Sequence, residues 1–391
     1  MYFYIQNIRN MYKNFMKNMF NILHQSKKSS ARIGTIQTQH GIIETPFFMP
    51  IATYGAVKTQ SSNDIKDLPS KILLSNTYHL YIRPGKEILE KAGGLHKFMN
   101  WDGIILTDSG GYQVYSLQGM RKISNDGVTF QSHLDGSKHH FTPEKVVDIQ
   151  RSIGSDIMMM LDVCPPGDAN KAKWIEALNL TTEWAKRAKR HFDETEPLYG
   201  HSQIISPIVQ GGTDLELRKQ SALELMDIDC EMYAIGGLAV GEPKPEMLKV
   251  VNFLDNILPK NKPRYLMGVG TPADLIENIL NGVDMFDCVM PTRNARNSQL
   301  FSYDGKINIR NSRYKDDFSP IDTNGFSVSS EVYSKAYLHH LFKTNEVLGL
   351  RIATEHNLKF YIHLMNEVKI QIKNDNFEKW AKEFLERYNN E

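Results

Sequence analysis

The sequence has little cysteine, no long apolar run and almost no net charge. Its three cysteines, Cys164, Cys230 and Cys288, are odd in number and far apart in a chain of 391 residues. This excludes a disulfide framework and indicates a reducing compartment. No apolar stretch approaches the roughly 20 residues that span a bilayer, so we expect no membrane segment and a cytoplasmic location. The formal net charge is +1, so a nucleic-acid partner would need a local basic patch.

Acidic residues are missing from residues 1–43, although this segment carries several lysines and arginines. Transit peptides share that composition, but the segment is rich in Asn and Tyr rather than Arg and Ser, so targeting is the less favoured interpretation. We expect residues 1–20 to be an extension that is either disordered or the result of a wrongly assigned start codon. Their role stays open. Residues 21–391 are expected to form a single domain.

Short apolar runs alternate regularly with longer segments of helical character. Runs that are almost continuously apolar are typical of strands buried on both faces, as in a parallel sheet covered by helices. Thr142-Pro143 and Thr271-Pro272 are helix-start signals. The alternation predicts an α/β fold, a (β/α)8 TIM barrel with an N-terminal hairpin at 31–45 and a C-terminal helical subdomain; a doubly wound open sheet is the alternative. The eight runs are 47–50, 72–76, 104–107, 157–161, 205–209, 232–236, 265–269 and 283–289.

Polar residues follow most of the predicted strands, at the edge where a barrel gathers its chemistry. Asp108, Asp162 and Asp287 come at the ends of the third, fourth and eighth strands. Paired carboxylates make and break glycosidic bonds, because one attacks the anomeric carbon while the other moves protons. Other residues at these strand ends would surround a flat ring: Ser109, Gly110, Gly111, Tyr112, Gln210, Gly237, Leu238 and Glu242.

Two arginines, Arg293 and Arg296, follow the last predicted strand in a segment expected to be a loop. Guanidinium groups beside a carboxylate nucleophile suit a substrate that carries phosphate. These residue types mildly favour transfer at a nucleoside over hydrolysis of a plain sugar. A capping Asp287 with two solvated arginines would explain the stretch 282–301 equally well if it stood alone.

Six segments, in order along the chain, resemble the tRNA-guanine transglycosylase family, the queuine tRNA-ribosyltransferases, in its bacterial form. Each lies at a predicted strand end or in the loop after it, and the resemblance runs from about residue 30 to about residue 370. The segments are TDSGGYQV at 107–114, HLDGSKHHFTPE at 133–144, IVQGG at 208–212, GGLAVGE at 236–242, YLMGVGTP at 265–272 and FDCVMPTRNARN at 286–297.

The resemblance implies a reaction and a role for each motif. Asp287 would be the nucleophile that attacks C1′ of the guanosine at wobble position 34 of a tRNA with a GUN anticodon, giving a covalent tRNA–enzyme intermediate. Asp108 would be the general acid/base. Asp162 would bind the purine's amino and ring N–H groups, with Gln210 and Gly237 as further base-recognition positions and Tyr112 stacked on the ring.

The resemblance also implies partners. The incoming base would be guanine or preQ1, with Glu242 near the aminomethyl group of preQ1; the choice between preQ1 and queuine stays open. A homodimer is implied as well. RNA contact is implied for Gly268, Val269, Gly270, Thr271, Pro272, Ala273 and Asp274, and for Thr292, Arg293, Asn294, Ala295 and Arg296.

One feature of the family is absent. Most members carry a C-x-C-x-x-C motif that binds a structural zinc together with a downstream histidine. The matching positions are Gly325, Ser327 and Ser330, and only His356 remains. One imidazole cannot hold tetrahedral zinc, so we expect no metal and no other cofactor. Residues from about 302 to 345 would replace the zinc subdomain, held by apolar packing of Phe326, Val328, Val332, Tyr333, Tyr337 and Leu338.

Two other functions stay open. The chain could be a non-catalytic partner subunit that binds tRNA or queuine, although such a subunit has no chemical need for three carboxylates. Guanine exchange that survived Asp287→Ala would favour this alternative. The chain could also be a TIM-barrel glycoside hydrolase, which incorporation of labelled guanine into tRNA without net hydrolysis would exclude.

Overall fold

The structure, a computed structural model, describes residues 19–116 and 121–389. The extension expected at 1–20 therefore lies outside the described residues, except for Met19 and Phe20. Parallel strands occur in all eight predicted runs, which confirms an α/β fold with parallel strands. Their bounds are β4 Phe47–Met49, β5 Ile72–Ser75, β6 Ile104–Thr107, β10 Ile157–Met159, β11 Ile204–Ser206, β12 Ile208–Val209, β13 Tyr233–Ile235, β14 Arg264–Leu266 and β15 Met285–Asp287.

The parallel strands form two sheets, in the orders β11-β10-β6-β5 and β12-β13-β14-β15-β4. The sheets approach each other at both ends. Ile51, just beyond β4, makes a parallel bridge to Leu74 of β5. At the other end only Pro207 separates β11 from β12, because proline has no N–H with which to continue a ladder.

The strands are buried on both faces, as their apolar runs predict. Ile72 and Leu74 of β5 belong to an inner cluster between the strands, whereas Leu73 between them packs in a second cluster toward the helices. In β15, Met285 is in the inner cluster and Phe286 faces the helices. Asp287 therefore continues the inward-facing side of its strand.

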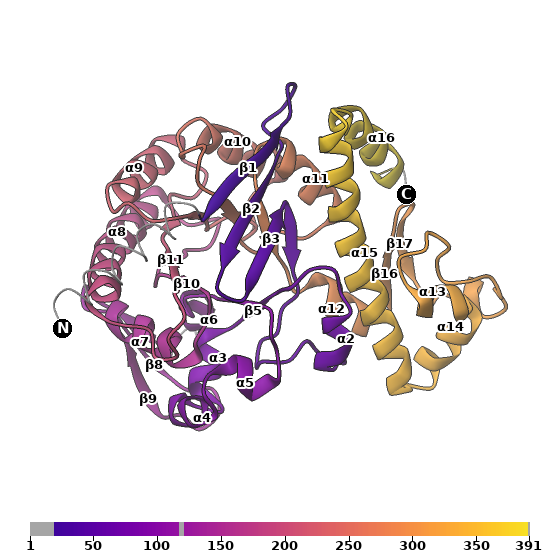
Figure 1. The fold of residues 1–391 in the computed structure, drawn as a ribbon, viewed down its shortest axis with the longest axis horizontal. Coiled ribbons are helices and arrows are strands. Elements are labelled where there is room, and N and C mark those ends of the chain that lie inside the picture. Colours follow the sequence, from indigo (N-terminus) through magenta and orange to yellow (C-terminus); the bar gives the residue numbers. More distant parts are fainter. Residues whose placement is uncertain (1–18, 117–120, 390–391) are drawn as a thin grey trace.

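Helices surround the strands in a ring (Figure 1). The Thr142 side chain accepts the Lys145 N–H at the start of α7, and Thr271 accepts the Asp274 N–H at the start of α11. Both predicted helix starts are confirmed. The surrounding helices are α7 Pro143–Ile153, α8 Lys171–Glu194, α9 Leu215–Met226, α10 Lys244–Asp255 and α11 Pro272–Leu280.

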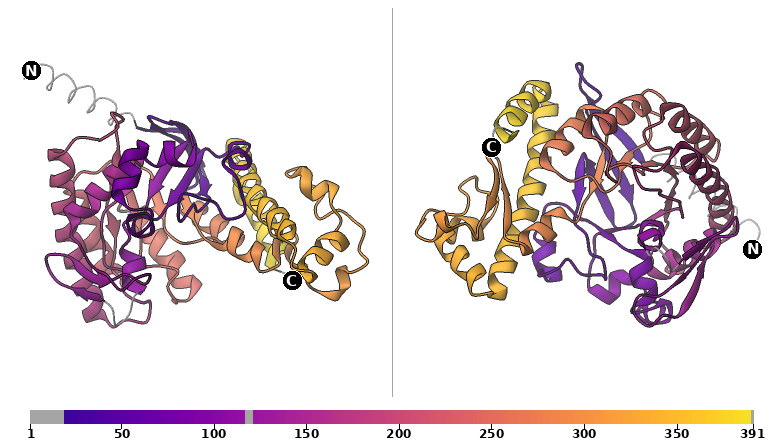
Figure 2. Two further views of the ribbon diagram at one scale, coloured as in Figure 1. Left: turned by 90° about the horizontal axis from the view of Figure 1, so that it is seen from below. Right: turned by 180° about the vertical axis from the view of Figure 1, so that it is seen from behind.

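An antiparallel sheet of β1 (Phe20–Gln25), β2 (Arg32–Thr38) and β3 (Gly41–Thr45) precedes the parallel strands. β3 leads through Pro46 directly into β4, so this sheet lies at the N-terminal ends of the parallel strands (Figure 2). Ile36 and Ile43 complete the inner cluster from that side.

Shorter elements fill the loops. A second antiparallel sheet consists of β7 Arg121–Ile123, β8 Val128–Gln131 and β9 Lys138–Phe141. Small helices lie between β4 and β7: α2 Ser62–Lys66, α3 Thr77–Ile82, α4 Lys86–Ala92, α5 Leu95–Met99 and α6 Gly111–Ser116. Among the described residues, no helix is both long and apolar enough to cross a membrane.

The C-terminal third contains a small unit beside the parallel strands. The long helix α15 (Val347–Lys373) runs between the two, and α16 (Phe377–Asn389) follows it (Figure 1). The small unit has its own apolar cluster, which includes Leu300, Leu338 and Phe342. Its elements are β16 Gln299–Ser302, β17 Gly305–Asn308, the 3-10 turn Ser312–Tyr314, α13 Val328–Val332 and α14 Lys335–Lys343.

Two expectations for this region are wrong. Residues 292–296 are not a loop but belong to helix α12 (Met290–Arg296), because Pro291 sits in its first turn, where a fixed φ favours helix initiation. Val328 and Val332 do not pack in place of zinc, since each is 70% exposed. Of the other residues expected there, Leu338 is fully buried, Phe326 and Tyr333 are partly buried against apolar clusters, and Tyr337 is exposed.

Candidate active site

Asp287 lies at the C-terminal end of β15 and is buried. Its Oδ1 accepts the Tyr265 hydroxyl at 2.5 Å and the Gly268 N–H at 2.8 Å. Burial raises the pKa of this carboxyl above its ordinary value, and the two donors oppose that shift. Both hydrogen bonds end on the same oxygen, Oδ1.

Asp108 directly follows β6 and accepts four hydrogen bonds. Oδ1 accepts the N–H groups of Thr77 at 2.8 Å and Gly110 at 3.2 Å. Oδ2 accepts the side-chain amides of Gln113 at 2.7 Å and of Asn76. Burial nevertheless raises its pKa to about 6. A carboxyl with that pKa can give and take a proton near neutral pH.

Asp162 lies three residues beyond β10 and is held from two sides. Its Oδ1 accepts the Ser109 hydroxyl and its Oδ2 accepts Gln210 Nε2, each at 2.8 Å. Burial raises its pKa to about 6 as well. Gln210 Oε1 is buried and has no hydrogen-bond partner among the described residues. An acceptor left unpaired beside a carboxylate is suited to N–H donors on a ligand.

The three carboxylates belong to one site. Ser109, which binds Asp162, is the neighbour of Asp108 in the chain. Tyr265 donates to Asp287, and the charges of both Asp287 and Asp108 contribute to raising the pKa of its phenol, after burial as the main cause. The structure thus brings the C-terminal ends of β6, β10 and β15 together, as the predicted rim requires.

Glycines leave space in this site. A Cβ on Gly111 would lie 2.7 Å from both the carbonyl and Oδ1 of Asp162, and a Cβ on Gly237 would overlap Gln210 Oε1. Gly110 has φ +77°, which places its N–H on Asp108. A larger residue at position 111 would therefore overlap the Asp162 backbone, and one at position 237 would displace the Gln210 side chain.

Other predicted ring-binding residues differ in accessibility. Tyr112 is the second residue of α6 and is 59% exposed, so its ring is open for stacking. Leu238 is buried in the core. Glu242 binds its own loop, since its Oε2 accepts the Val240 N–H at 3.0 Å and its Oε1 accepts that of Ala239. The carboxylate is therefore already engaged before any ligand arrives.

The residues expected to contact RNA are partly buried. In α12, Arg293 is exposed and Asn294 and Arg296 are half-exposed, while Thr292 and Ala295 are buried. In the other segment Gly268 is exposed, and Thr271 and Asp274 are half-exposed. The remaining positions, Val269, Gly270, Pro272 and Ala273, are buried and can only position their neighbours.

Two functional neighbours were missed from the sequence. Arg218 of α9 is fully buried, and its guanidinium binds the carbonyls of Val209, Gly236 and Gly237 at 2.7 to 3.2 Å. It therefore fixes the ends of β12 and β13 beside Gln210. Tyr265 opens the segment YLMGVGTP and lies in β14, which pairs with β15. A polar hydroxyl on the inward-facing side of the strand next to Asp287 was the signal that could have identified this residue.

The residues at the family's zinc positions form a hydrogen-bonded group instead. His356 is fully buried, with Nδ1 2.8 Å from Ser330 Oγ and Nε2 2.8 Å from the Phe301 carbonyl. Ser327 binds Glu355 at 3.3 Å, and Gly325 has no side chain. Both imidazole nitrogens are occupied and no thiolate is present, so this donor set does not fit zinc.

Comparison with known proteins agrees with the site. A family model described as Queuine tRNA-ribosyltransferase matches residues 26–390. Proteins named queuine tRNA-ribosyltransferase from Caldanaerobacter subterraneus and Thermoanaerobacter pseudethanolicus are each 51% identical over 369 residues, covering 94% of this chain and 97% of theirs. One from Lysinibacillus sphaericus is 47% identical over 94% of this chain. The resemblance predicted from the motifs is confirmed, and the chain belongs to the queuine tRNA-ribosyltransferase family.

Proposed function

We propose that this chain is a tRNA-guanine transglycosylase of queuosine biosynthesis, which exchanges the wobble guanine of tRNA for a 7-deazaguanine such as preQ1. The observation that carries the proposal is the meeting of Asp108, Asp162 and Asp287 in one buried site, each with a different set of hydrogen-bond donors. Three carboxylates in three environments can take three roles in one reaction.

In the first half-reaction, Asp287 Oδ2 attacks C1′ of the guanosine and the bond between C1′ and N9 breaks. The guanine leaves with the proton that Asp108 supplies, and a ribosyl ester forms on Asp287. Tyr265 and Gly268 hold the other oxygen and keep the nucleophile ionised.

In the second half-reaction, Asp108 takes the proton from N9 of the incoming base, and that nitrogen attacks C1′. The ester bond breaks and the Asp287 carboxylate is regenerated. Acid and base roles fall on the same residue, so a pKa of about 6 serves both directions.

Base recognition would use Asp162 and the free Gln210 Oε1. The carboxylate accepts the ring N–H and the amino group of the purine, and Tyr112 covers the ring face. Discrimination by buried acceptors is strong because a base without the matching donors leaves them unpaired. Arg293, with Arg296 behind it, would hold tRNA phosphates. Glu242 would meet the aminomethyl group of preQ1 after releasing its loop amides.

We also propose that the parallel strands close into a (β/α)8 barrel. The Ile51–Leu74 bridge and the single-residue break at Pro207 support closure on both sides. The β1–β3 hairpin sheet and the small unit of β16, β17, α13 and α14 would then be additions to one barrel domain. A homodimer acting in the cytoplasm is the assembly that we expect.

We further propose that the small unit functions without zinc. Ser330 and the Phe301 carbonyl satisfy both nitrogens of His356, which supports a hydrogen-bonded replacement for the metal. No step of the proposed reaction needs a metal or another cofactor.

The decisive experiment compares wild-type protein with Asp287→Asn in exchange of labelled guanine into tRNA. We expect a loss of at least about 10³-fold, the scale on which removal of a covalent nucleophile acts. The wild-type protein should form a tRNA–protein adduct on a denaturing gel, and the variant should form none while still binding tRNA. Exchange or an adduct that survives the substitution would contradict the assignment, and release of guanine without incorporation would indicate a hydrolase.

A further inference from the structure

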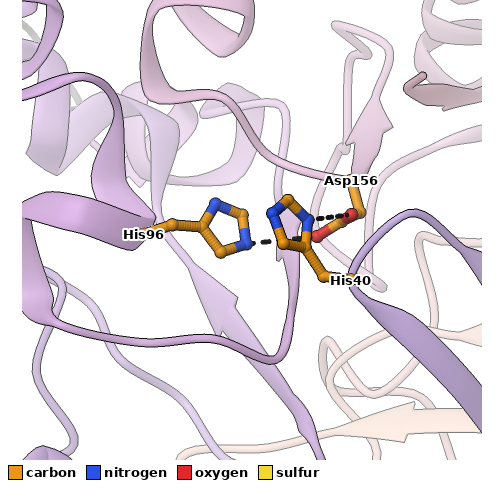
Figure 3. A group of neighbouring side chains, drawn as sticks. All are labelled: His40, His96 and Asp156. Carbon is orange, nitrogen blue, oxygen red and sulfur yellow. Dashed lines mark hydrogen bonds and ion pairs between the residues drawn. The ribbon is translucent and has the colours of Figure 1, made fainter. Parts of the chain in front are cut away.

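Three polar side chains from distant parts of the chain, His40, His96 and Asp156, meet in the structure (Figure 3). They lie at the N-terminal ends of the parallel strands, at the end opposite the three carboxylates. His40 lies in the turn between β2 and β3, His96 in α5, and Asp156 directly before β10. Their potential ligand atoms all lie within 4.8 Å of one another. Among residues 19–116 and 121–389, this is the only such group of three donors.

The two imidazoles face the same carboxylate. His40 Nδ1 is 2.7 Å from Asp156 Oδ1, and His96 Nε2 is 3.4 Å from Oδ2. The rings are stacked, with centroids 3.8 Å apart and planes inclined by 17°, so one ring must turn about its Cβ–Cγ bond before both lone pairs point at one ion. From this arrangement we propose that His40, His96 and Asp156 form a binding site for a divalent transition-metal ion such as Zn²⁺. Two imidazoles and one carboxylate are ligands that such ions prefer, and water would complete a tetrahedral set.

The surroundings resemble the support that metal ligands receive. The Asp156 side chain is fully buried, and its Oδ2 accepts the Ile105 N–H at 2.9 Å. The ring of His201 packs edge-on against His40, with centroids 4.8 Å apart. Outer partners of this kind fix the orientation of ligands. The side chains of His40 and His96 are 26% and 11% exposed, so an ion has a path from solvent.

Metal binding would replace contacts that the side chains now make. His96 Nε2 lies 3.0 Å from the Gly103 carbonyl. To bind a metal ion, this nitrogen must be deprotonated and must give up its hydrogen bond to the carbonyl. The proton shared between His40 and Asp156 would be released. The ion would tie the β2–β3 turn to the strand ends, far from the carboxylates. Zinc found in the purified protein would therefore belong here and not at His356.

The test uses the full-length chain, stripped with a chelator and then dialysed against Zn²⁺ or Co²⁺. We expect one ion per chain and a Co²⁺ absorption spectrum of nitrogen and oxygen ligands. His40→Gln and His96→Gln should each weaken binding at least about tenfold, because loss of even an outer partner of a metal ligand costs roughly 10- to 100-fold. His191→Gln is the matched control, because it removes an imidazole that is 2.8 Å from Asp148 Oδ1 but belongs to no group of three described donors.

Either of two results would overturn the proposal. The wild-type chain could take up no more Zn²⁺ than the His40→Gln/His96→Gln double variant, or His191→Gln could weaken Zn²⁺ binding as much as the ligand variants do. Circular dichroism checks that each variant is folded. If one does not fold, the wild-type protein still decides the question by NMR. Zn²⁺ must shift the ring resonances of His40 and His96 and leave those of His191 and His356 in place.

Discussion

Burial raises the pKa of all three carboxyls of the active site, but their hydrogen-bond donors differ. Asp108 accepts two backbone N–H groups and two side-chain amides, whereas Asp162 accepts one hydroxyl and one amide. The pKa of each is about 6. A carboxyl with a raised pKa in the folded state costs stability wherever it is ionised. The site is therefore maintained against a free-energy penalty that the rest of the core offsets.

We expect Asp162→Asn to abolish guanine binding and to stabilise the fold. The folded pKa of about 6 exceeds the unfolded value of about 3.9, so the folded wild-type chain binds the proton more tightly. The penalty is absent below about pH 4, grows as pH rises to about 6, and is constant above that at about 2–3 kcal/mol. Denaturant unfolding of both proteins at pH 4.5 and pH 7.5 should show a gain that is larger at pH 7.5. A gain of equal size at both values would refute the assigned pKa.

Binding of the base also requires free space beside the Gln210 side chain, which Gly237 provides. Gly237→Ala places a methyl group on Gln210 Oε1, whereas Gly200→Ala places one in open space. Both glycines have positive φ, +62° and +76°, so both substitutions carry the same backbone strain of roughly 1 kcal/mol. We expect Gly237→Ala alone to raise KM for guanine, by about tenfold or more. Equal KM values in the two variants would show that Gln210 does not touch the base.

At the scale of elements, we propose that hydrogen bonds replace a metal site in the small C-terminal unit. Ser330 and the Phe301 carbonyl occupy the two nitrogens of a fully buried His356. The Ser330 hydroxyl satisfies His356 Nδ1 alone, whereas a zinc ion would need further ligands. The nearby apolar cluster supplies the packing.

This geometry predicts that zinc binding can be restored. The triple variant Gly325→Cys, Ser327→Cys, Ser330→Cys gives three thiolates with His356, a common structural zinc set. We expect it to hold one more Zn²⁺ per chain than the parent protein in elemental analysis. Adding His356→Ala should weaken that extra ion by at least about tenfold. A triple variant that folds but gains no zinc would mean that the segment 325–330 has moved away from His356.

Strands and helix starts could be predicted from the sequence, whereas one short helix and the exposure of two valines could not. Strands buried on both faces have continuous apolar sequences, and Thr-Pro caps are local, so both were predictable. Helix α12 was not, because seven residues are too few for an amphipathic period and its stability comes from packing on α15. Val328 and Val332 are apolar but exposed, and no local signal distinguishes them from buried valines.

At the scale of the whole molecule, a buried ion pair attaches the N-terminal sheet to the parallel strands. Arg32 of β2 binds Asp284 through Nε at 3.0 Å and through a terminal nitrogen at 2.6 Å, and both side chains are buried. Asp284 also accepts the Arg264 N–H at 2.8 Å. This contact joins residues 252 positions apart, so it forms only when the whole chain is folded.

We expect Arg32→Ala to lower the free energy of unfolding by about 3–5 kcal/mol, because it leaves Asp284 buried without the guanidinium that binds both of its oxygens. Arg351→Ala is the control. Arg351 is 2.7 Å from Asp64, but its side chain is 52% exposed, so water screens the pair and its loss should cost about 1 kcal/mol or less. Chemical denaturation of both variants measures the difference. Similar losses would mean that burial does not decide the strength of these pairs.

The sequence by itself determined the strands, several helix starts and the family, and it singled out the three strand-end carboxylates that we propose as the reactive groups. Those features depend on short stretches, since apolar runs, caps and strand-end motifs act over a few neighbouring residues. Only the tertiary structure decided that Arg218 and Tyr265 support the site, that Ser330 satisfies His356, and that His40, His96 and Asp156 meet. Each of these depends on side chains brought together from distant elements, and no local pattern records such a meeting.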